Sequence, residues 1–194
     1  MNARRGLGEV LFEGQWLRLR RHRDWEFIEH RHARGIAVII AVTKDQRLLL
    51  VEQERIPVGR RVIELPAGLI GDREARHAAE SFDDAARREL WEETGYRAGR
   101  MIPLMQVPFS AARSPDLYSF FRAENLEREH SGGGVESERI IVHLPALDTI
   151  HEWLRERAAD GALIDPKIFI GLHLLAHPSA AIGFPPLAQR ANRG

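Results

Sequence analysis

The alternation of apolar and polar positions along the chain predicts both strands and helices. Residues 35–43 form a nearly continuous apolar run, which is typical of a strand buried on both faces. A polar turn follows, and residues 47–53 predict the strand that returns beside it. Between Ser81 and Gly95 the pattern is helical, because Ser81 suits the N-cap and Gly95 suits the left-handed position beyond the last turn. The pattern therefore predicts an α/β fold.

Further strands and helices are expected on either side of this helix. Three short strand-like segments at residues 9–32 carry too many Arg and His side chains to form a core alone, so a small antiparallel sheet packed against another body is expected. We predict three parts: an N-terminal β subdomain at 1–34, a main domain at 35–177, and a frayed C-terminal tail at 178–194. In the main domain, further strands are expected at 62–65, 101–107, 117–123 and 139–144, a polar loop at 124–134, and helices at 145–158 and after Asp165.

Composition narrows the classes of partner. Lys and Arg together number 28, as do Asp and Glu, and the pI is near 7.2, so no overall charge favours nucleic acid or an anionic membrane. The chain has no cysteine, which fits a reducing compartment, and no apolar run approaches the ~18 residues of a membrane span. We expect a cytoplasmic protein that binds neither nucleic acid nor membrane.

Three carboxylates fall on one face of the predicted helix. Glu89, Glu92 and Glu93 are spaced i, i+3 and i+4, so they project as one cluster beside the small side chains that face the protein body. Mutual repulsion and desolvation make such a cluster costly, and a divalent cation relieves both costs. Oxygen ligands favour Mg²⁺, with Mn²⁺ as a substitute. The alternative is an acidic helix face that only contacts water.

The sequence around the three carboxylates favours a metal site over a helix face that only contacts water. Gly68 and the run Arg88–Tyr96 (RELWEETGY), preceded by Glu64–Ala67 (ELPA), resemble the Nudix box of the Nudix hydrolases. The box is stretched by about six residues before the helix, so either Glu74 or Glu80 fills its first acidic position, and Glu80 is preferred. The resemblance implies a Nudix-type α/β/α sandwich over residues 35–177.

The resemblance also implies roles for individual residues. Metal ions would be held by Glu89, Glu92, Glu93 and the carbonyl of Ala67, while Arg88 orients the cluster by pairing with Glu92. In ADP-ribose pyrophosphatases, a Glu just ahead of an IxVH strand is the base that activates water. Residues 140–143 (IIVH) reproduce that strand, so Glu136 or Glu138 is the candidate base, and the choice between them stays open.

Two substrate-binding residues follow from the narrower ADP-ribose pyrophosphatase branch. In that branch the N-terminal sheet exchanges across a homodimer and helps to bind adenine. The resemblance therefore implies that Trp25 stacks on the base. The alternative is that Trp25 only packs in the subdomain interface. Arg55, in a segment that resembles the family's QxR, would hold a phosphate, with a surface pair to Glu52 or Glu54 as the alternative.

The resemblance implies hydrolysis of a nucleoside diphosphate linked to another group. ADP-ribose, cleaved to AMP and ribose 5-phosphate, is the first-choice substrate. A nucleotide sugar such as UDP-glucose or GDP-mannose is the alternative within the enzyme class. A Nudix-fold binding module without turnover is the alternative outside it, although a pure binder would have no need for three repelling carboxylates.

Overall fold

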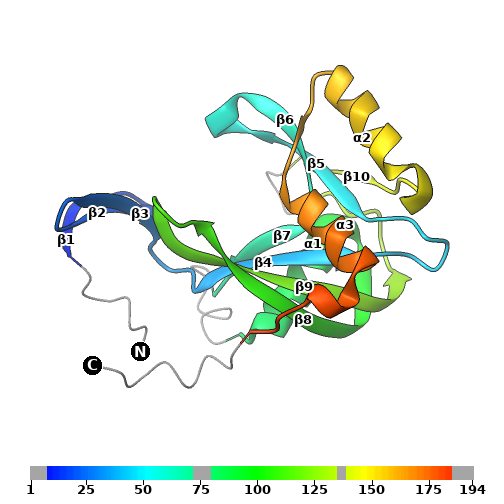
Figure 1. Cartoon of the computed structure of the whole chain (residues 1–194), viewed down its shortest axis with the longest axis horizontal. Helices are drawn as coiled ribbons and strands as arrows, with labels where there is room; N and C mark the ends of the chain where they lie inside the picture. Colours follow the sequence, from blue (N-terminus) through cyan, green and yellow to red (C-terminus); the bar gives the residue numbers. More distant parts are fainter. Residues whose placement is uncertain (1–7, 72–79, 135–138, 185–194) are drawn as a thin grey trace.

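The computed structural model describes residues 8–71, 80–134 and 139–184 (Figure 1). Within them, no helix is long and apolar enough to cross a membrane. The first three strands form a separate antiparallel sheet in the order β1 (Glu9–Glu13), β2 (Leu17–His22) and β3 (Trp25–His30). This N-terminal sheet lies beside the main body of the molecule in Figure 1, as its polar composition predicts.

Two four-stranded sheets form the main body. The first has the order β7 (Ala67–Ile70), β4 (Gly35–Ala41), β9 (Ser114–Arg128) and β8 (Tyr96–Ser110). The second has the order β10 (Ile141–His143), β5 (Leu50–Arg55), β6 (Arg60–Glu64) and β11 (Leu163–Ile164). The pairs β4–β9 and β6–β11 are parallel, and the other neighbours are antiparallel.

Strand β4 lies at the centre of the core and is buried along its whole length. Its side chains alternate between two apolar clusters, with Ile36, Val38 and Ile40 in one and Ala37, Ile39 and Ala41 in the other. This alternation confirms that the continuous apolar run at residues 35–43 belongs to a strand covered on both faces.

Helix α1 (Phe82–Thr94) covers one face of the first sheet with Phe82, Ala85, Ala86 and Leu90. Its ends are those that the sequence predicts. The Ser81 hydroxyl oxygen accepts a hydrogen bond from the backbone N–H of Asp84 at 3.0 Å, and Gly95 adopts a left-handed φ of 75°.

The opposite side of the core is closed by α2 (Ile150–Ala159) and α3 (Lys167–Ala176), which contribute Ile150, Leu154, Ile168 and Leu174. Three short 3₁₀ turns complete the regular elements of the described residues, at Ile56–Val58, Leu147–Thr149 and Pro178–Ala180. Helices on both sides of the sheets give the α/β/α arrangement expected from the sequence.

Four local expectations were wrong. Residues 67–70 form strand β7 and not the expected loop. Residues 124–128 extend β9, whereas a polar loop was expected to begin at residue 124. Strand β8 is longer than the expected strand at 101–107, and it continues past Pro108 by means of a register shift between Pro108 and Ser110. In the expected tail, residues 178–184 are packed: the N–H of Gly183 donates to Leu104 O at 2.7 Å, and Phe184 meets Phe121 edge to face.

Candidate active site

Two carboxylates of the α1 face, those of Glu89 and Glu92, pair with one guanidinium. Arg88 Nη1 lies 2.7 Å from Glu89 Oε1 and 3.1 Å from Glu92 Oε2, so the expected i, i+4 pair is present. Burial opposes the charge on Arg88, but the carboxylates of Glu80 and Glu89 outweigh it and hold the pKa of Arg88 above its ordinary value. Arg88 therefore stays charged and partly offsets the repulsion within the cluster.

Glu80 joins this cluster from the residue before the helix cap. Its Oε1 accepts hydrogen bonds from Arg88 Nη2 at 3.0 Å and from the backbone N–H of Gly71 at 3.1 Å. Glu74, the other candidate for the first acidic position, lies outside the described residues. Glu80 thus makes the contacts expected of a residue that fixes the start of the acidic helix.

Strand β7 lies directly against the acidic face of α1. The backbone N–H of Ala67 donates to Glu93 Oε2 at 3.0 Å. A Cβ atom at Gly68 would lie only 1.9 Å from Glu89 Cδ, so a side chain at this position would push the Glu89 carboxylate away from the strand. The approach brings the backbone of Ala67 to the carboxylates, as the predicted role of its carbonyl requires.

The donor set of this cluster fits a hard divalent cation, because every donor is an oxygen. Among the described residues, however, no three His, Cys, Asp or Glu side chains are already grouped to hold a metal ion. The hydrogen bonds to Arg88 and to the Ala67 N–H engage these carboxylates instead. A cation would therefore have to draw the carboxylates out of these bonds.

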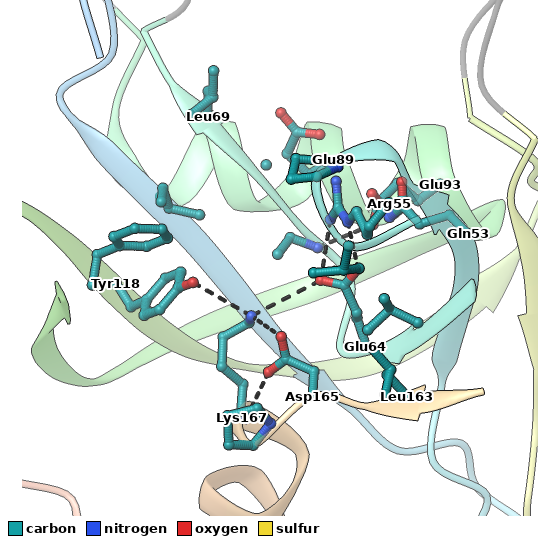
Figure 2. Close-up of a pocket in the computed structure, with 18 of the residues that line it drawn as sticks. Gln53, Arg55, Glu64, Leu69, Glu89, Glu93, Tyr118, Leu163, Asp165 and Lys167 are labelled. Carbon is teal, nitrogen blue, oxygen red and sulfur yellow. Dashed lines mark hydrogen bonds and ion pairs between the residues drawn. The ribbon is translucent and has the colours of Figure 1, made fainter. Parts of the chain in front are cut away.

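The acidic cluster opens into a pocket of about 840 Å³, a size that suits a nucleotide-sized ligand. Residues from both sheets, from the start of α3 and from the N-terminal sheet line it (Figure 2). The acidic residues lie at one end and Lys167 lies at the other, with Arg55 and Glu64 between them.

Arg55 points into this pocket because it follows Gln53 by two positions on β5 and shares its face. It forms a bidentate pair with buried Glu64, at 2.6 Å from Nε to Oε1 and 3.1 Å from Nη2 to Oε2. Burial opposes its charge, but Glu64 outweighs burial and raises the pKa of Arg55. Pairing with Glu52 or Glu54 was therefore the wrong alternative.

Both of those residues lie on the opposite face of β5, away from Arg55. Glu52 contacts Arg61 Nε at 2.6 Å and His143 Nε2 at 2.6 Å. His143 of the predicted IIVH strand is therefore engaged on this second face and does not line the pocket.

Sequence reasoning missed a second group of polar residues, at the far end of the pocket. Lys167 Nζ lies 2.5 Å from Asp165 Oδ2, 3.9 Å from Glu64 Oε2 and 3.5 Å from the Tyr118 hydroxyl oxygen. We call Tyr118, Asp165 and Lys167 the lysine cluster. The local signal was the Asp165–Lys167 tripeptide, in which Asp165 predicts only the start of a helix.

A histidine–aspartate pair was also missed, where the N-terminal sheet meets β9. His30 lines the pocket, and its Nδ1 lies 2.8 Å from Oδ2 of buried Asp116. Burial opposes the charge on Asp116, but the contact with His30 outweighs burial and lowers the pKa of Asp116. The pair holds the last residue of β3 at the pocket wall.

One predicted residue, Trp25, is not brought to the pocket of this chain. Trp25 lies at the start of β3, is 61% exposed, and does not line the pocket. Glu136 and Glu138, the candidate bases, lie outside the described residues.

Comparisons with known proteins agree with this geometry. The NUDIX domain family matches residues 31–160. The GDP-mannose pyrophosphatase of Escherichia coli K12 is 30% identical over 167 residues, which cover 79% of this chain and 81% of that protein. The ADP-ribose pyrophosphatase of Bacillus subtilis is 31% identical over 101 residues, which cover 52% of this chain and 50% of that protein.

A solved structure described as an ADP compounds hydrolase shares the fold. Its TM-score is 0.59 and its sequence identity 19%, over 89% of this chain and 86% of that one. The α/β sandwich predicted from the sequence is thereby confirmed. With its box residues gathered in one pocket and the family match over most of its length, the chain belongs to the Nudix family and is a Nudix pyrophosphohydrolase.

Proposed function

We propose that this enzyme hydrolyses the pyrophosphate bond of ADP-ribose to give AMP and ribose 5-phosphate. The observation that carries the proposal is that the acidic face of α1 and Arg55 line one pocket, so that a metal-binding group and a phosphate-binding group face the same ligand. The similarity to the Bacillus subtilis ADP-ribose pyrophosphatase supports this choice of substrate.

The cofactor in this proposal is Mg²⁺, held by Glu89, Glu92, Glu93 and the carbonyl of Ala67. Nudix hydrolases generally use divalent metal ions, and the oxygen donors of this cluster suit Mg²⁺ first. When bound, the cation would neutralise charge on the pyrophosphate and lower the pKa of water. Arg88 would keep the freed carboxylates in place, because it contacts Glu80, Glu89 and Glu92 at once.

The remaining steps fall to side chains of the chain itself. Arg55 would exchange its pair with Glu64 for a phosphate oxygen, for which a guanidinium fork is well suited. Water attacks one phosphorus, its oxygen joins that phosphate, and the bridging oxygen leaves with the other. Glu136 or Glu138 remains the predicted base that takes the proton from water.

GDP-mannose is the second candidate substrate. The Escherichia coli GDP-mannose pyrophosphatase matches a larger share of this chain than does the ADP-ribose pyrophosphatase, at nearly equal identity. The two substrates share a nucleoside diphosphate joined to a sugar, so the acidic cluster and Arg55 would act on both in the same way. The choice of base and sugar separates them.

The proposal includes a homodimer that forms through the N-terminal sheet. Large apolar side chains are exposed on this sheet and on the turns that join its strands, at Val10, Phe12, Trp16, Leu17, Trp25 and Ile28. Patches of this kind favour association. In such a dimer Trp25 would stack on the base in the partner's pocket, since it does not reach its own. A cytoplasmic location stays a prediction.

The decisive experiment is incubation of the enzyme with ADP-ribose and Mg²⁺, followed by chromatography for AMP, beside a sample with excess chelator. AMP that forms only with the metal supports the proposal. A parallel series with GDP-mannose and UDP-glucose ranks the alternative substrates by kcat/KM. Binding of ADP-ribose without AMP formation, in every metal tested, would contradict it.

A further inference from the structure

The end of the pocket opposite the acidic cluster carries a group of polar side chains that none of the steps above uses. Lys167 and Asp165 stand at the start of α3, and Tyr118 stands on β9 (Figure 2). Strand β11 brings them together: its parallel pairing with β6 sets the N–H of Asp165 at 3.0 Å from the carbonyl of Ile63, next to Glu64. Elements distant in the sequence thus build one site.

The lysine cluster is held rigidly. Asp165 accepts from its neighbour twice, through Oδ1 from the Lys167 backbone N–H at 2.7 Å and through Oδ2 from Nζ at 2.5 Å. The ammonium group also lies 4.7 Å from the centre of the Tyr118 ring. Lys167 is only 7% exposed, so its ammonium group is fixed at the pocket wall and is not free in solvent.

Charge at this end of the pocket is balanced. Two cations, Arg55 and Lys167, face two carboxylates, Glu64 and Asp165. When Arg55 binds the pyrophosphate, Lys167 alone faces these two carboxylates, so this end offers no excess of positive charge for a further phosphate group. A neutral ligand rich in hydroxyl groups would instead find carboxylate acceptors, an ammonium donor and the Tyr118 hydroxyl. Burial raises the pKa of Tyr118, which keeps that hydroxyl protonated.

The wall beside the cluster is aromatic. The rings of Phe109 and Tyr118 lie 5.2 Å apart between centroids, and both line the pocket. A face of aromatic rings beside a few fixed hydrogen-bonding groups suits a ring-shaped polyhydroxyl ligand, with apolar CH faces and polar edges.

We propose that Tyr118, Asp165 and Lys167 form a subsite for the sugar joined to the nucleoside diphosphate, and that they recognise its hydroxyl groups. This inference rests on the proposed function, since it assigns the distal half of the same substrate. Arg55 and Glu64 lie between the acidic cluster and this subsite, which places the pyrophosphate over Arg55 and the sugar over Lys167.

The test compares two substrates that differ only at the distal group. One is ADP-ribose, and the other is the β-methyl ester of ADP, in which a methyl group replaces the ribose; both release AMP. Asp165→Asn should lower kcat/KM for ADP-ribose by about tenfold or more, because a site built for hydroxyl groups loses one of its two carboxylate acceptors and the negative charge. The same change should leave the methyl ester within about twofold.

Tyr118→Phe removes one hydroxyl and should lower kcat/KM for ADP-ribose by about threefold to tenfold, again without effect on the methyl ester. Asp148→Asn, an exposed Asp outside the pocket, is the matched control. Thermal melting of each variant establishes that it is folded. An equal fall for both substrates would overturn the subsite, and so would a gain for both, which is the result expected if the cluster binds phosphate.

Calorimetric binding of both ligands without metal separates this inference from the proposed function. If the wild-type enzyme binds ADP-ribose but forms no AMP, the proposed function fails, and the binding ratio of the two ligands still tests the subsite. Equal affinity for ADP-ribose and the methyl ester would overturn the subsite directly.

Discussion

The two ends of the pocket hold the same kinds of side chain in opposite proportions. At the acidic end, the carboxylates of Glu89, Glu92 and Glu93 line the pocket, and the guanidinium of Arg88 pairs with Glu89, Glu92 and the neighbouring Glu80. At the lysine end, two carboxylates meet two cations. Both ends are largely shielded from water, so an excess of one charge is costly at either end. Only the acidic end has such an excess. We therefore expect the acidic end to bind an external cation, whereas the lysine end balances its own charges.

The largest effect is expected at the acidic end. Glu93→Gln should reduce turnover of ADP-ribose by about a thousandfold, because it removes a charge that would hold the cation, while the amide oxygen can still accept from the Ala67 N–H. AMP formation at saturating Mg²⁺ measures the loss. Glu127→Gln, an exposed acid on β9, should have no effect. Near-normal turnover of the Glu93 variant would contradict the metal assignment.

The second prediction concerns Arg88→Met, which should reveal the excess of carboxylates at the acidic end. Without its guanidinium, buried carboxylates repel one another, and the free energy of unfolding should fall by about 3–5 kcal/mol in the absence of metal. Added Mg²⁺ should recover more stability in this variant than in the wild type, because it replaces the lost positive charge. Urea denaturation with and without Mg²⁺ measures both values. A metal effect of equal size in the two proteins would argue against a cation site among these acids.

Lys167→Met should behave differently at the balanced end. The free energy of unfolding should fall by only about 2 kcal/mol, because Glu64 keeps Arg55 and Asp165 keeps the backbone N–H of residue 167. Mg²⁺ should not recover this loss, because the variant leaves two carboxylates beside Arg55, and an excess of one carboxylate is too small to form a cation site. Urea denaturation of this variant with and without Mg²⁺ measures the effect. Recovery of stability by Mg²⁺ would contradict the proposed difference between the two ends.

Arg55→Gln should have the smallest effect and should concern binding more than stability. Arg55 is about half-exposed and bridges the two ends, so its loss should raise KM for ADP-ribose by about tenfold with a smaller change in kcat. Steady-state kinetics separate the two parameters. A fall in kcat alone would instead place Arg55 at the reacting phosphorus and not at ground-state binding.

The contrast between the ends also explains what could be predicted from the sequence. The acidic end follows from local spacing, because Glu89, Glu92 and Glu93 share one helix whose ends are marked by Ser81 and Gly95. The burial of β4 follows from its own apolar run in the same way. Local sequence patterns determine the acidic helix and strand β4, so both could be predicted from the sequence.

The lysine end depends on contacts between distant parts of the chain. Lys167 meets Glu64 only because β11, a strand of two residues, pairs in parallel with β6, and no periodic pattern is detectable in so short a strand. Strand β8 was underestimated for a related reason. Pro108 predicts an interruption, but the register shift between Pro108 and Ser110 lets the pairing with β9 continue. Tertiary pairing outweighed the local signal in both cases.

Glu64 contacts both Arg55 and Lys167, and this sharing links the two halves of a substrate thermodynamically. When a phosphate binds Arg55, Glu64 keeps only its contact with Lys167. This changes the electric field at the sugar. By reciprocity, the factor by which the diphosphate changes the affinity for the sugar equals the factor by which the sugar changes the affinity for the diphosphate. Cleavage separates the two halves and ends that cooperativity, so each product leaves with its own, weaker affinity.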